Sequence, residues 1–366
     1  MTTPGHPMNI GIIIPTLTSG DAVGNDALGM ARELRGLGHT VTFFVTNSTL
    51  DDEATEDIGD IAAALSDPDD VVIYHHSIGF EYGVRAMEML PARRKAVKYH
   101  NVTPPEFFRG IDAEVVKACA AGLSELPRLA RTNAHIWADS AYNGQHLQQH
   151  APGRAYTELP PFHQADDLLS VEPDYRTVSG LDDWSTNILF VGRIVPNKNV
   201  GLAAAAFAEF TKRYDSRSRL IIVGDMPVPK HAVAVREQMH ALGIADRVFI
   251  TGKVSNAQLK ALYLTADVLL LTSLHEGFCV PLIEAMGLRV PVVAVPNAAI
   301  PYTGGDAVLY ANADAVKIAD ALEAVLSDAT AREASINRGH ARYTEKFTNA
   351  AIRTRFHWLF RELEQS

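Results

Sequence analysis

Two glutamates in one short stretch have the type and spacing of residues that bind a polar ligand. In SLHEGFCVPLIEAMG, Glu276 and Glu284 flank an apolar segment that Gly277 and Pro281 interrupt. Proline at this place suits the first turn of a helix. The amides of residues 277–280 would then be free at a helix start, where anions are stabilised. The stretch therefore predicts an anion site with one carboxylate on a loop and another on a helix.

Two cations follow a different predicted strand. The stretch FVGRIVPNKN places Arg193 and Lys198 five residues apart, just beyond the strand end. Arginine, through its planar fork, and lysine, as a point charge, can together clamp a diphosphate. Glu276 would accept hydrogen bonds from hydroxyl groups, and Glu284 would reach a second polyol. The alternative is that these are solvated loop charges and an incidental helical acid.

The composition limits the class of protein. The chain has 366 residues, 47% of them hydrophobic and 21% charged, which is typical of a globular protein with two domains. Its formal net charge of -10 argues against nucleic acid as the main partner, because phosphate backbones select basic faces. The net charge does not exclude an acidic substrate, because a few basic residues can be concentrated at one site.

The two cysteines and the apolar runs bear on location. Cys119 and Cys279 lie far apart and outside any CxxC spacing, so they form no metal site by themselves and favour a reduced compartment. The first seven residues are not typical of a secretory signal, and no apolar run reaches the ~20 residues that cross a bilayer. We expect a cytoplasmic protein, soluble or peripheral at the inner face of the membrane.

Apolar runs typical of strands alternate with helical patterns along the chain. In the first part they cover residues 9–15, 40–46, 70–76, 96–101 and 134–140. After a stretch with three prolines and no lasting period, the alternation restarts with NILFVGR, RLIIVGD, RVFITG, DVLLLTS and PVVAV. Apolar strands separated by helices indicate parallel sheets that are covered on both faces.

We therefore predict an α/β protein with two Rossmann-like, doubly wound domains. The expected parts are an N-terminal domain over 1–160, a linker over 161–185, a C-terminal domain over 186–345 and a terminal helix over 346–366. A nicotinamide enzyme fits poorly, because the loop after the first strand has no GxGxxG and the second strand ends at Thr46 and Asn47 without an acid. Gly20 and Gly24 in that loop suit close approach of a ligand, although a plain turn explains them equally well.

These stretches resemble a known family. EGFCVPLIEAMG is similar to the Glu-x7-Glu motif of the retaining glycosyltransferases of family 4, which have the GT-B fold, and GRIVPNKN is similar to their diphosphate-binding loop. SGDAVGND, YHHSIG and KYHNVTPPEFF resemble one bacterial branch. The resemblance implies two domains that face each other across a cleft, with the C-terminal helix crossing back to the N-terminal domain. Where relatives often have Pro-Glu in a late loop, this chain has Pro301 and Tyr302.

The resemblance also implies residue roles. The catalytic residues would be His100, which faces the donor sugar, Glu276, which binds sugar hydroxyls, and the diphosphate ligands Arg193 and Lys198. Glu284 would hold the ribose. The other donor-binding residues would be Gly20, Asp21, Gly252, Lys253, Val254, Ser255, Gly277, Phe278, Cys279 and Val280. His76 and Asn101 are candidates for contact with acceptor or sugar, and a structural role fits His76 equally well.

The implied reaction moves a sugar from a UDP- or GDP-linked donor to a hydroxyl of a glycan or glycolipid in bacterial polysaccharide or envelope synthesis. The resemblance implies that anomeric configuration is retained. Because no carboxylate is obviously placed as a nucleophile on the far face of the sugar, same-face attack fits better than double displacement. We expect no cofactor and no metal, because the Asp-x-Asp at Asp67–Asp69 precedes a strand and is typical of a turn. A nucleotide-sugar epimerase, a sugar phosphorylase and a non-catalytic binding subunit remain as alternatives.

One basic cluster in this acidic chain is a candidate membrane contact. Arg93, Arg94 and Lys95 precede a predicted strand, and Phe107 and Phe108 follow it. Basic residues beside aromatic ones can face anionic lipid. The other interpretation is a solvated loop.

Overall fold

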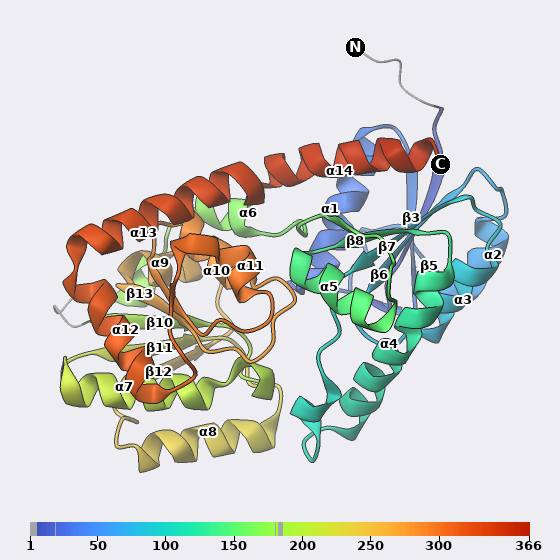
Figure 1. Cartoon of the computed structure of the whole chain (residues 1–366). Coiled ribbons are helices and arrows are strands. Elements are labelled where there is room, and N and C mark those ends of the chain that lie inside the picture. The colour runs from blue at the N-terminus through green and yellow to red at the C-terminus, as the bar shows by residue number, and fades with distance from the viewer. Residues whose placement is uncertain (1–5, 19, 180, 182–185) are drawn as a thin grey trace. The chain divides into compact units, whose positions relative to one another are not determined.

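The computed structural model describes residues 6–18, 20–179, 181 and 186–366, and the chain divides into two compact units. Unit 1 consists of Met1–His163 and Asn349–Ser366, and unit 2 is Gln164–Thr348. Each unit is a parallel sheet with helices on both faces (Figure 1). The α/β fold class is therefore confirmed.

Unit 1 contains a seven-stranded sheet in the order β5-β3-β1-β6-β7-β8-β9, in which every neighbouring pair is parallel. Its strands are β1 (Asn9–Ile13), β3 (Thr40–Val45), β5 (Thr55–Asp57), β6 (Val71–His76), β7 (Arg94–Tyr99), β8 (His135–Ala138) and β9 (Thr157–Glu158). A separate two-stranded pair is formed by β2 (Thr16–Leu17) and β4 (Asn47–Ser48). Side chains alternate between the faces, so Ile12 packs into one apolar cluster and Ile13 into another.

The helices of unit 1 cover both faces of this sheet. They are α1 (Ala22–Gly36), α2 (Ile61–Ala64), α3 (Glu81–Met89), α4 (Ala113–Arg131), α5 (Ala141–His150) and α14 (Asn349–Glu364). Asp21, Asp112 and Ser140 begin α1, α4 and α5 by accepting hydrogen bonds from backbone amides of the first turn. Helices α3 and α4 pack on one face, and α1 and α14 on the other.

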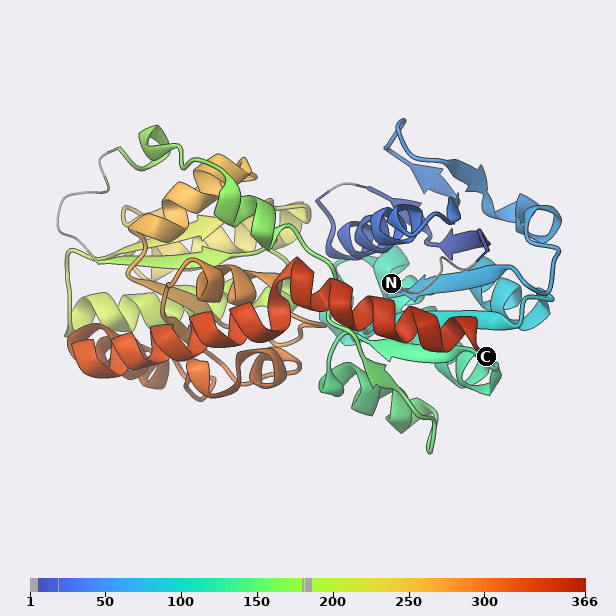
Figure 2. The same ribbon diagram turned by 90° about the horizontal axis from the view of Figure 1, so that it is seen from above.

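Helix α14 belongs to unit 1 although it lies at the end of the chain. It follows the strands of that unit lengthwise in Figure 2, and Phe356 contacts Trp137 and Phe162 edge to face. Arg94 donates a hydrogen bond from Nε to the carbonyl of Glu364 at 3.0 Å. Five apolar residues of α14 are buried in the cluster that also contains β1: Ile352, Phe356, Leu359, Phe360 and Leu363.

Unit 2 contains a six-stranded parallel sheet in the order β12-β11-β10-β13-β14-β15. The strands are β10 (Asn187–Val191), β11 (Arg219–Val223), β12 (Val248–Gly252), β13 (Val268–Leu271), β14 (Val292–Ala294) and β15 (Leu309–Tyr310). The helices are α6 (Ala165–Ser170), α7 (Val200–Arg213), α8 (Pro229–Ala241), α9 (Asn256–Thr265), α10 (Val280–Gly287), α11 (Ile300–Gly304), α12 (Ala315–Ser327) and α13 (Ala329–Arg342). On β10, Leu189 packs toward α9 and α10, whereas Ile188 and Phe190 pack toward α7 and α12.

The boundaries differ from the expected ones at the segment 161–185. Its described part contains α6 and a short 3-10 helix, Tyr175–Val178, both in unit 2, while residues 180 and 182–185 lie outside the described residues. The apolar residues Leu168 and Val178 are buried in the core of unit 2. A proline-rich composition therefore concealed a segment that packs.

Two local interpretations hold. The only elements after Asp314 are helical, ending with a π-helical turn at Tyr343–Phe347 and then α14. At the Asp-x-Asp, the amide of Asp69 donates to the carboxylate of Asp67 at 2.9 Å, so this is an Asx turn as predicted. Among the residues described, no helix has the length and apolarity that crossing a membrane requires.

Candidate functional site

The candidate site in unit 2 is built from two loops at the carboxyl ends of adjacent strands. Strands β10 and β13 pair in parallel, so the loop that follows each leaves the same edge of the sheet. The amide of Leu274 donates to the carbonyl of Asn197 at 2.8 Å, and the Asn197 side chain donates to the carbonyl of His275 at 3.3 Å. These bonds hold the two loops together.

Lys198 and Glu276 are brought into contact by these loops. Lys198 donates from Nζ to Oε1 of Glu276 at 2.6 Å, and Ser273 donates to the same oxygen at 2.7 Å. Glu276 is 8% exposed. Burial alone would lower the pKa of Lys198, but the adjacent Glu276 carboxylate outweighs it and raises that pKa. The raised pKa keeps the Lys198 ammonium charged at the strand end.

Arg193 has a different ion-pair partner from Lys198. Its guanidinium is 65% exposed and lies 3.6 Å from the carboxylate of Asp225, which is itself half-exposed. Exposed ion pairs of this kind contribute little, so Arg193 can change partner at low cost. The structure thus assembles one of the two predicted diphosphate ligands and leaves the other on the surface.

The start of helix α10 supplies backbone donors beside Glu276. Cys279 precedes the helix with φ of 74° in the left-handed region, and Pro281 lies in the first turn. No described residue accepts a hydrogen bond from the amides of Gly277, Phe278 or Cys279. The Phe278 carbonyl is held by the hydroxyl of Thr303 at 2.8 Å. Free amides at a helix start form an environment that favours anions.

Glu284 lies one turn into α10 and is partly buried. Tyr263 of α9 is buried, and its hydroxyl donates to Oε2 of Glu284 at 2.8 Å. Burial raises the pKa of Glu284 to about 7, even though the bond from Tyr263 lowers it. The carboxyl group is thus fixed in position, with its titration near neutral pH.

The segment expected to contact the base follows β12. Gly252 has φ of 71°, which favours glycine, and its carbonyl accepts a hydrogen bond from the amide of Gly224. Ser255 begins α9 through a reciprocal capping box with Gln258, so its hydroxyl is already engaged. Lys253 is exposed, and Val254 packs partly against the core of unit 2.

The glycine loop of unit 1 has a local explanation. Gly20 has φ of 81°, and Asp21 is the N-cap of α1. A Cβ at Gly24 would lie 2.3 Å from the carbonyl oxygen of Thr18, so this glycine allows the chain to approach itself. Gly24 lies in the first turn of α1, and this close contact within unit 1 accounts for the glycine.

His100 lies in a buried polar network of unit 1. Its Nδ1 bonds Oδ2 of Asp139 at 3.0 Å, and its Nε2 lies 2.9 Å from Nδ1 of His75. Asp139 also accepts a bond from Lys98. Burial alone would raise the pKa of Asp139, but His100 and Lys98 lower it. Both ring nitrogens of His100 therefore have partners within unit 1, and contact with a sugar would require the ring to exchange one of them.

His76 is buried and bonded within unit 1, which fits the structural role considered for it. It is fully buried, accepts from the hydroxyl of Tyr74 at 3.0 Å and donates to the carbonyl of Gly122 at 3.1 Å. Burial lowers its pKa to about 4, so it stays neutral. Asn101 is also buried, has φ of 74° and donates to the side chain of Asn143 at 3.2 Å.

In the basic cluster, Lys95 does not fit the predicted membrane contact. Lys95 is buried, and its Nζ donates to the carbonyls of Met87 and Leu90 at 2.9 and 2.7 Å, so it cannot reach a lipid surface. Arg94 bonds backbone carbonyls, whereas Arg93 is exposed. Phe107 is partly buried, and Phe108 packs against the core.

Sequence reasoning missed several residues that fix these groups. In unit 2 they are Asn197, Ser273 and Tyr263, and in unit 1 they are Asp26, Lys98 and Asp139. A charged residue inside an apolar strand, as in AVKYHN, was the available signal for Lys98. Ser273 is only three residues from its partner Glu276, but the partners of the others are distant in sequence, so no local pattern revealed them.

Comparison with known proteins agrees with this arrangement. The model of the family Glycosyl transferases group 1 matches residues 171–342. An alpha-D-kanosaminyltransferase of Streptomyces kanamyceticus is 27% identical over 57% of this chain and 53% of its own length. A D-inositol 3-phosphate glycosyltransferase of Segniliparus rotundus is 34% identical over 36% of this chain and 30% of its own. The chain thus spans about half or less of the curated relatives it matches.

Solved structures share the whole fold at low identity. Sucrose-phosphate synthase from Thermosynechococcus elongatus has a TM-score of 0.78 at 16% identity over 97% of this chain and 99% of its own. Anabaena HepE in complex with UDP-glucose has a TM-score of 0.78 at 17% identity over 97% of this chain and 100% of its own. The chain therefore has the GT-B fold, and its residues 171–342 match the model of Glycosyl transferases group 1.

Proposed function

We propose that this protein is a retaining glycosyltransferase that moves a sugar from a nucleotide-diphosphate sugar to an acceptor hydroxyl. The observation that carries the proposal is the contact of Lys198 with Glu276 beside free amides at the start of α10. At this strand end, the cation and the helix start can bind the diphosphate of such a donor, and the carboxylate can accept hydrogen bonds from its sugar hydroxyls.

In the proposed reaction the donor diphosphate replaces Glu276 as the partner of Lys198. Arg193, which is exposed, moves onto the same diphosphate, and Glu276 accepts hydrogen bonds from the sugar. Cleavage of the anomeric C–O bond leaves its electron pair on the diphosphate oxygen, where the two cations and the helix start stabilise the charge. The acceptor oxygen bonds the anomeric carbon from the same face, and its proton passes to the departing diphosphate.

Retention and metal independence are parts of this proposal. Retention rests on the resemblance of the Glu-x7-Glu segment to family 4. Independence of metal rests on the positive charge that Arg193, Lys198 and the α10 start already supply. The Asp-x-Asp of the chain forms a turn in which Asp67 accepts a hydrogen bond from the amide of Asp69.

For substrates, we propose a UDP- or GDP-linked donor and a glycan or glycolipid acceptor in the bacterial cytoplasm or at the inner face of the membrane. Support for UDP comes from a HepE structure described as a complex with UDP-glucose. Support for a lipid-linked acceptor comes from a relative named alpha-monoglucosyldiacylglycerol synthase, 27% identical over 38% of this chain and 31% of its own length.

A two-stage experiment tests the proposal. Saturation-transfer NMR of common nucleotide-sugars against the purified chain should identify the donor, and acceptor screening followed by NMR of the product should show an unchanged anomeric configuration. Epimerisation without an acceptor, or turnover that requires free phosphate, would assign the chain to the rival enzymes. Donor binding with no turnover for any acceptor would favour a non-catalytic subunit.

A further inference from the structure

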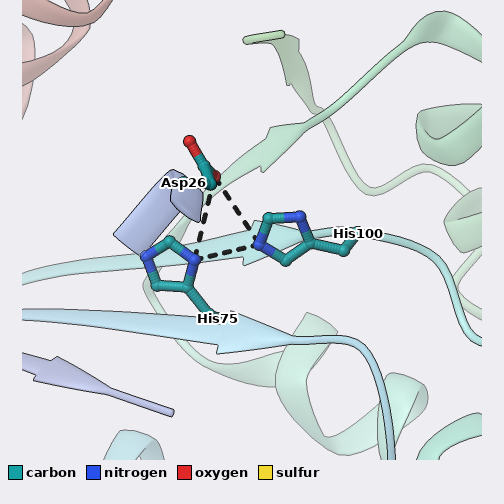
Figure 3. Close-up of side chains that lie close together, drawn as sticks. All are labelled: Asp26, His75 and His100. Atoms are coloured by element: carbon teal, nitrogen blue, oxygen red, sulfur yellow. Dashed lines mark hydrogen bonds and ion pairs between the residues drawn. The ribbon is translucent and has the colours of Figure 1, made fainter. Parts of the chain in front are cut away.

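The buried charged groups of the two units differ in what they leave for a ligand. In unit 1, Asp26, His75 and His100 converge (Figure 3), with Nδ1 of His75 and Nε2 of His100 bonded to each other at 2.9 Å. The ammonium of Lys98 lies 3.7 Å from Oδ2 of Asp26. These groups partner one another within unit 1. In unit 2, by contrast, the described residues donate to only one side-chain oxygen of Glu276.

The two carboxylate oxygens of Glu276 have different surroundings. Oε1 accepts hydrogen bonds from Nζ of Lys198 at 2.6 Å and from the hydroxyl of Ser273 at 2.7 Å. Oε2 accepts a hydrogen bond from no described residue. An ionised carboxylate can accept on both oxygens. Oε2 is therefore the oxygen that remains for a ligand.

Ser273 becomes the remaining anchor of this carboxylate once a donor is bound. In the proposed reaction the donor diphosphate takes Lys198 away from Oε1. The last torsion of a glutamate side chain is broad and has little preference of its own. Without a second bond the carboxylate would then turn freely. The Ser273 hydroxyl keeps Oε1 in place and so fixes the direction in which Oε2 points.

Ser273 is itself held by the loop that follows β14. It is 1% exposed, and Nδ2 of Asn297 donates to its carbonyl at 3.0 Å. The amide of Ala299 donates to the carbonyl of Glu276 at 3.3 Å. Between them, Ala298 has φ of 50°, a left-handed conformation that costs free energy in a residue other than glycine. The loop thus supports the backbone at both ends of the bond between Ser273 and Glu276.

We propose that Ser273, supported by Asn297, is a positioning residue that aims Oε2 of Glu276 at a hydroxyl of the donor sugar. This inference rests on the proposed function, because it deepens the role of Glu276 in that site. Ser273 acts through Glu276 and touches neither the sugar nor the diphosphate. It therefore contributes to sugar recognition and turnover, and not to the affinity for a bare nucleoside diphosphate.

The test compares the nucleotide-sugar found by the NMR screen with its own nucleoside diphosphate, beginning with UDP-glucose and UDP. Ser273→Ala should lower kcat/KM for the nucleotide-sugar about 10-fold to 100-fold, because a hydrogen bond to a charged group is lost. It should change the Kd of the nucleoside diphosphate less than about twofold. Wild-type kcat/KM in Ser273→Ala, or an equal loss of affinity for both compounds, would overturn the proposal.

A matched serine separates positioning from stability. Ser218 is also fully buried, and its hydroxyl donates to the carbonyl of Asp215 at 2.7 Å, ahead of β11 at the amino edge of the same sheet. Ser218→Ala should lower Tm, as Ser273→Ala does, but leave kcat/KM unchanged. Equal losses of kcat/KM in the two variants would assign the effect to packing and overturn the proposal.

Asn297→Ala is a milder variant in a partly exposed loop, so it tests the proposal even where Ser273→Ala does not fold. It should lower kcat/KM about 3-fold to 10-fold, the usual effect of losing one neutral hydrogen bond, and leave the Kd of the nucleoside diphosphate unchanged. Where Ser273→Ala does not fold, wild-type kcat/KM in Asn297→Ala would overturn the proposal.

The outcomes separate this inference from the proposed function. A wild-type chain that binds no nucleotide-sugar would contradict the proposed function and this inference with it. A wild-type chain that transfers the sugar, with Ser273→Ala equal to it, would overturn the positioning role alone. If the chain binds the nucleotide-sugar without turnover, calorimetry decides, because Ser273→Ala should then weaken the nucleotide-sugar and not the nucleoside diphosphate.

Discussion

The two units hold their buried charges in different ways. In unit 1, Lys98, Asp139 and His100 bond one another in a closed network. In unit 2, Lys198 and Glu276 form an ion pair beside backbone amides that donate to no described residue. Arg193, on the same loop as Lys198, is exposed. A closed network fixes the position of its members, whereas an open one can exchange a partner for a ligand. If the proposed function is correct, the closed network of unit 1 positions its members and the open pair of unit 2 binds the donor.

The strongest test of the open site is removal of Lys198, its partly buried cation. Lys198→Ala should raise the activation free energy by about 2–4 kcal/mol, because a charge-assisted contact to the leaving group is lost. This corresponds to a fall in kcat/KM for the donor of about 30-fold to 1000-fold. Arg193→Ala should have an effect in the same range. Lys212→Ala, at an exposed lysine of α7, is the matched control. Near-normal kcat/KM in either site variant would contradict the diphosphate assignment.

Substitutions of Glu276 and Glu284 should have different effects, because each is proposed to bind a different part of the donor. Glu276→Ala should impair turnover far more than binding of the bare nucleoside diphosphate, because its proposed partner is the sugar. Glu284→Ala should weaken the nucleoside diphosphate by roughly 1.5–3 kcal/mol, the usual worth of hydrogen bonds to a charged group. Calorimetry with the nucleotide measures both, and the reverse pattern would mean that the roles are exchanged.

Glu284 should also make nucleotide binding depend on pH. Burial raises its pKa to about 7 in the free protein. A ribose that donates two hydroxyl hydrogens requires the ionised carboxylate, so binding below pH 7 must release a proton. Affinity should therefore fall as pH drops below 7, by at most about tenfold per unit.

Two variants sharpen this pH test. Glu284→Gln should remove the dependence between pH 5.5 and 8 in calorimetry. Tyr263→Phe should shift its midpoint upward, because the Tyr263 hydroxyl bonds the carboxylate and lowers the Glu284 pKa. A pH dependence that persists in Glu284→Gln would show that another group titrates.

The smallest expected effect is that of a chelator on transfer. With Arg193, Lys198 and the α10 start supplying positive charge, excess EDTA should change the rate less than about twofold, or ~0.4 kcal/mol. Loss of transfer that Mn²⁺ restores, in a way that depends on Asp67 or Asp69, would contradict the metal-independent proposal.

The sequence by itself determined the fold class and the local conformation of the candidate site. Unbroken apolar strands between helices require a parallel sheet covered on both faces. Pro281 and Gly287 set the first turn and the end of α10, and the strand ahead of Glu276 placed it at a sheet edge. These features depend on residues a few positions apart, so local pattern is sufficient to predict them.

Only the tertiary structure decided which charged groups meet and which are buried. Lys198 and Glu276 are 78 residues apart, and Lys98 and Asp139 are 41 apart. Their contacts depend on strand order, which places loops from distant segments on the same edge of a sheet. Burial likewise made Lys95 and His76 structural, although their residue types suggested a surface or a ligand. The energy of a charged side chain depends on what surrounds it in space, and a local sequence pattern does not contain that information.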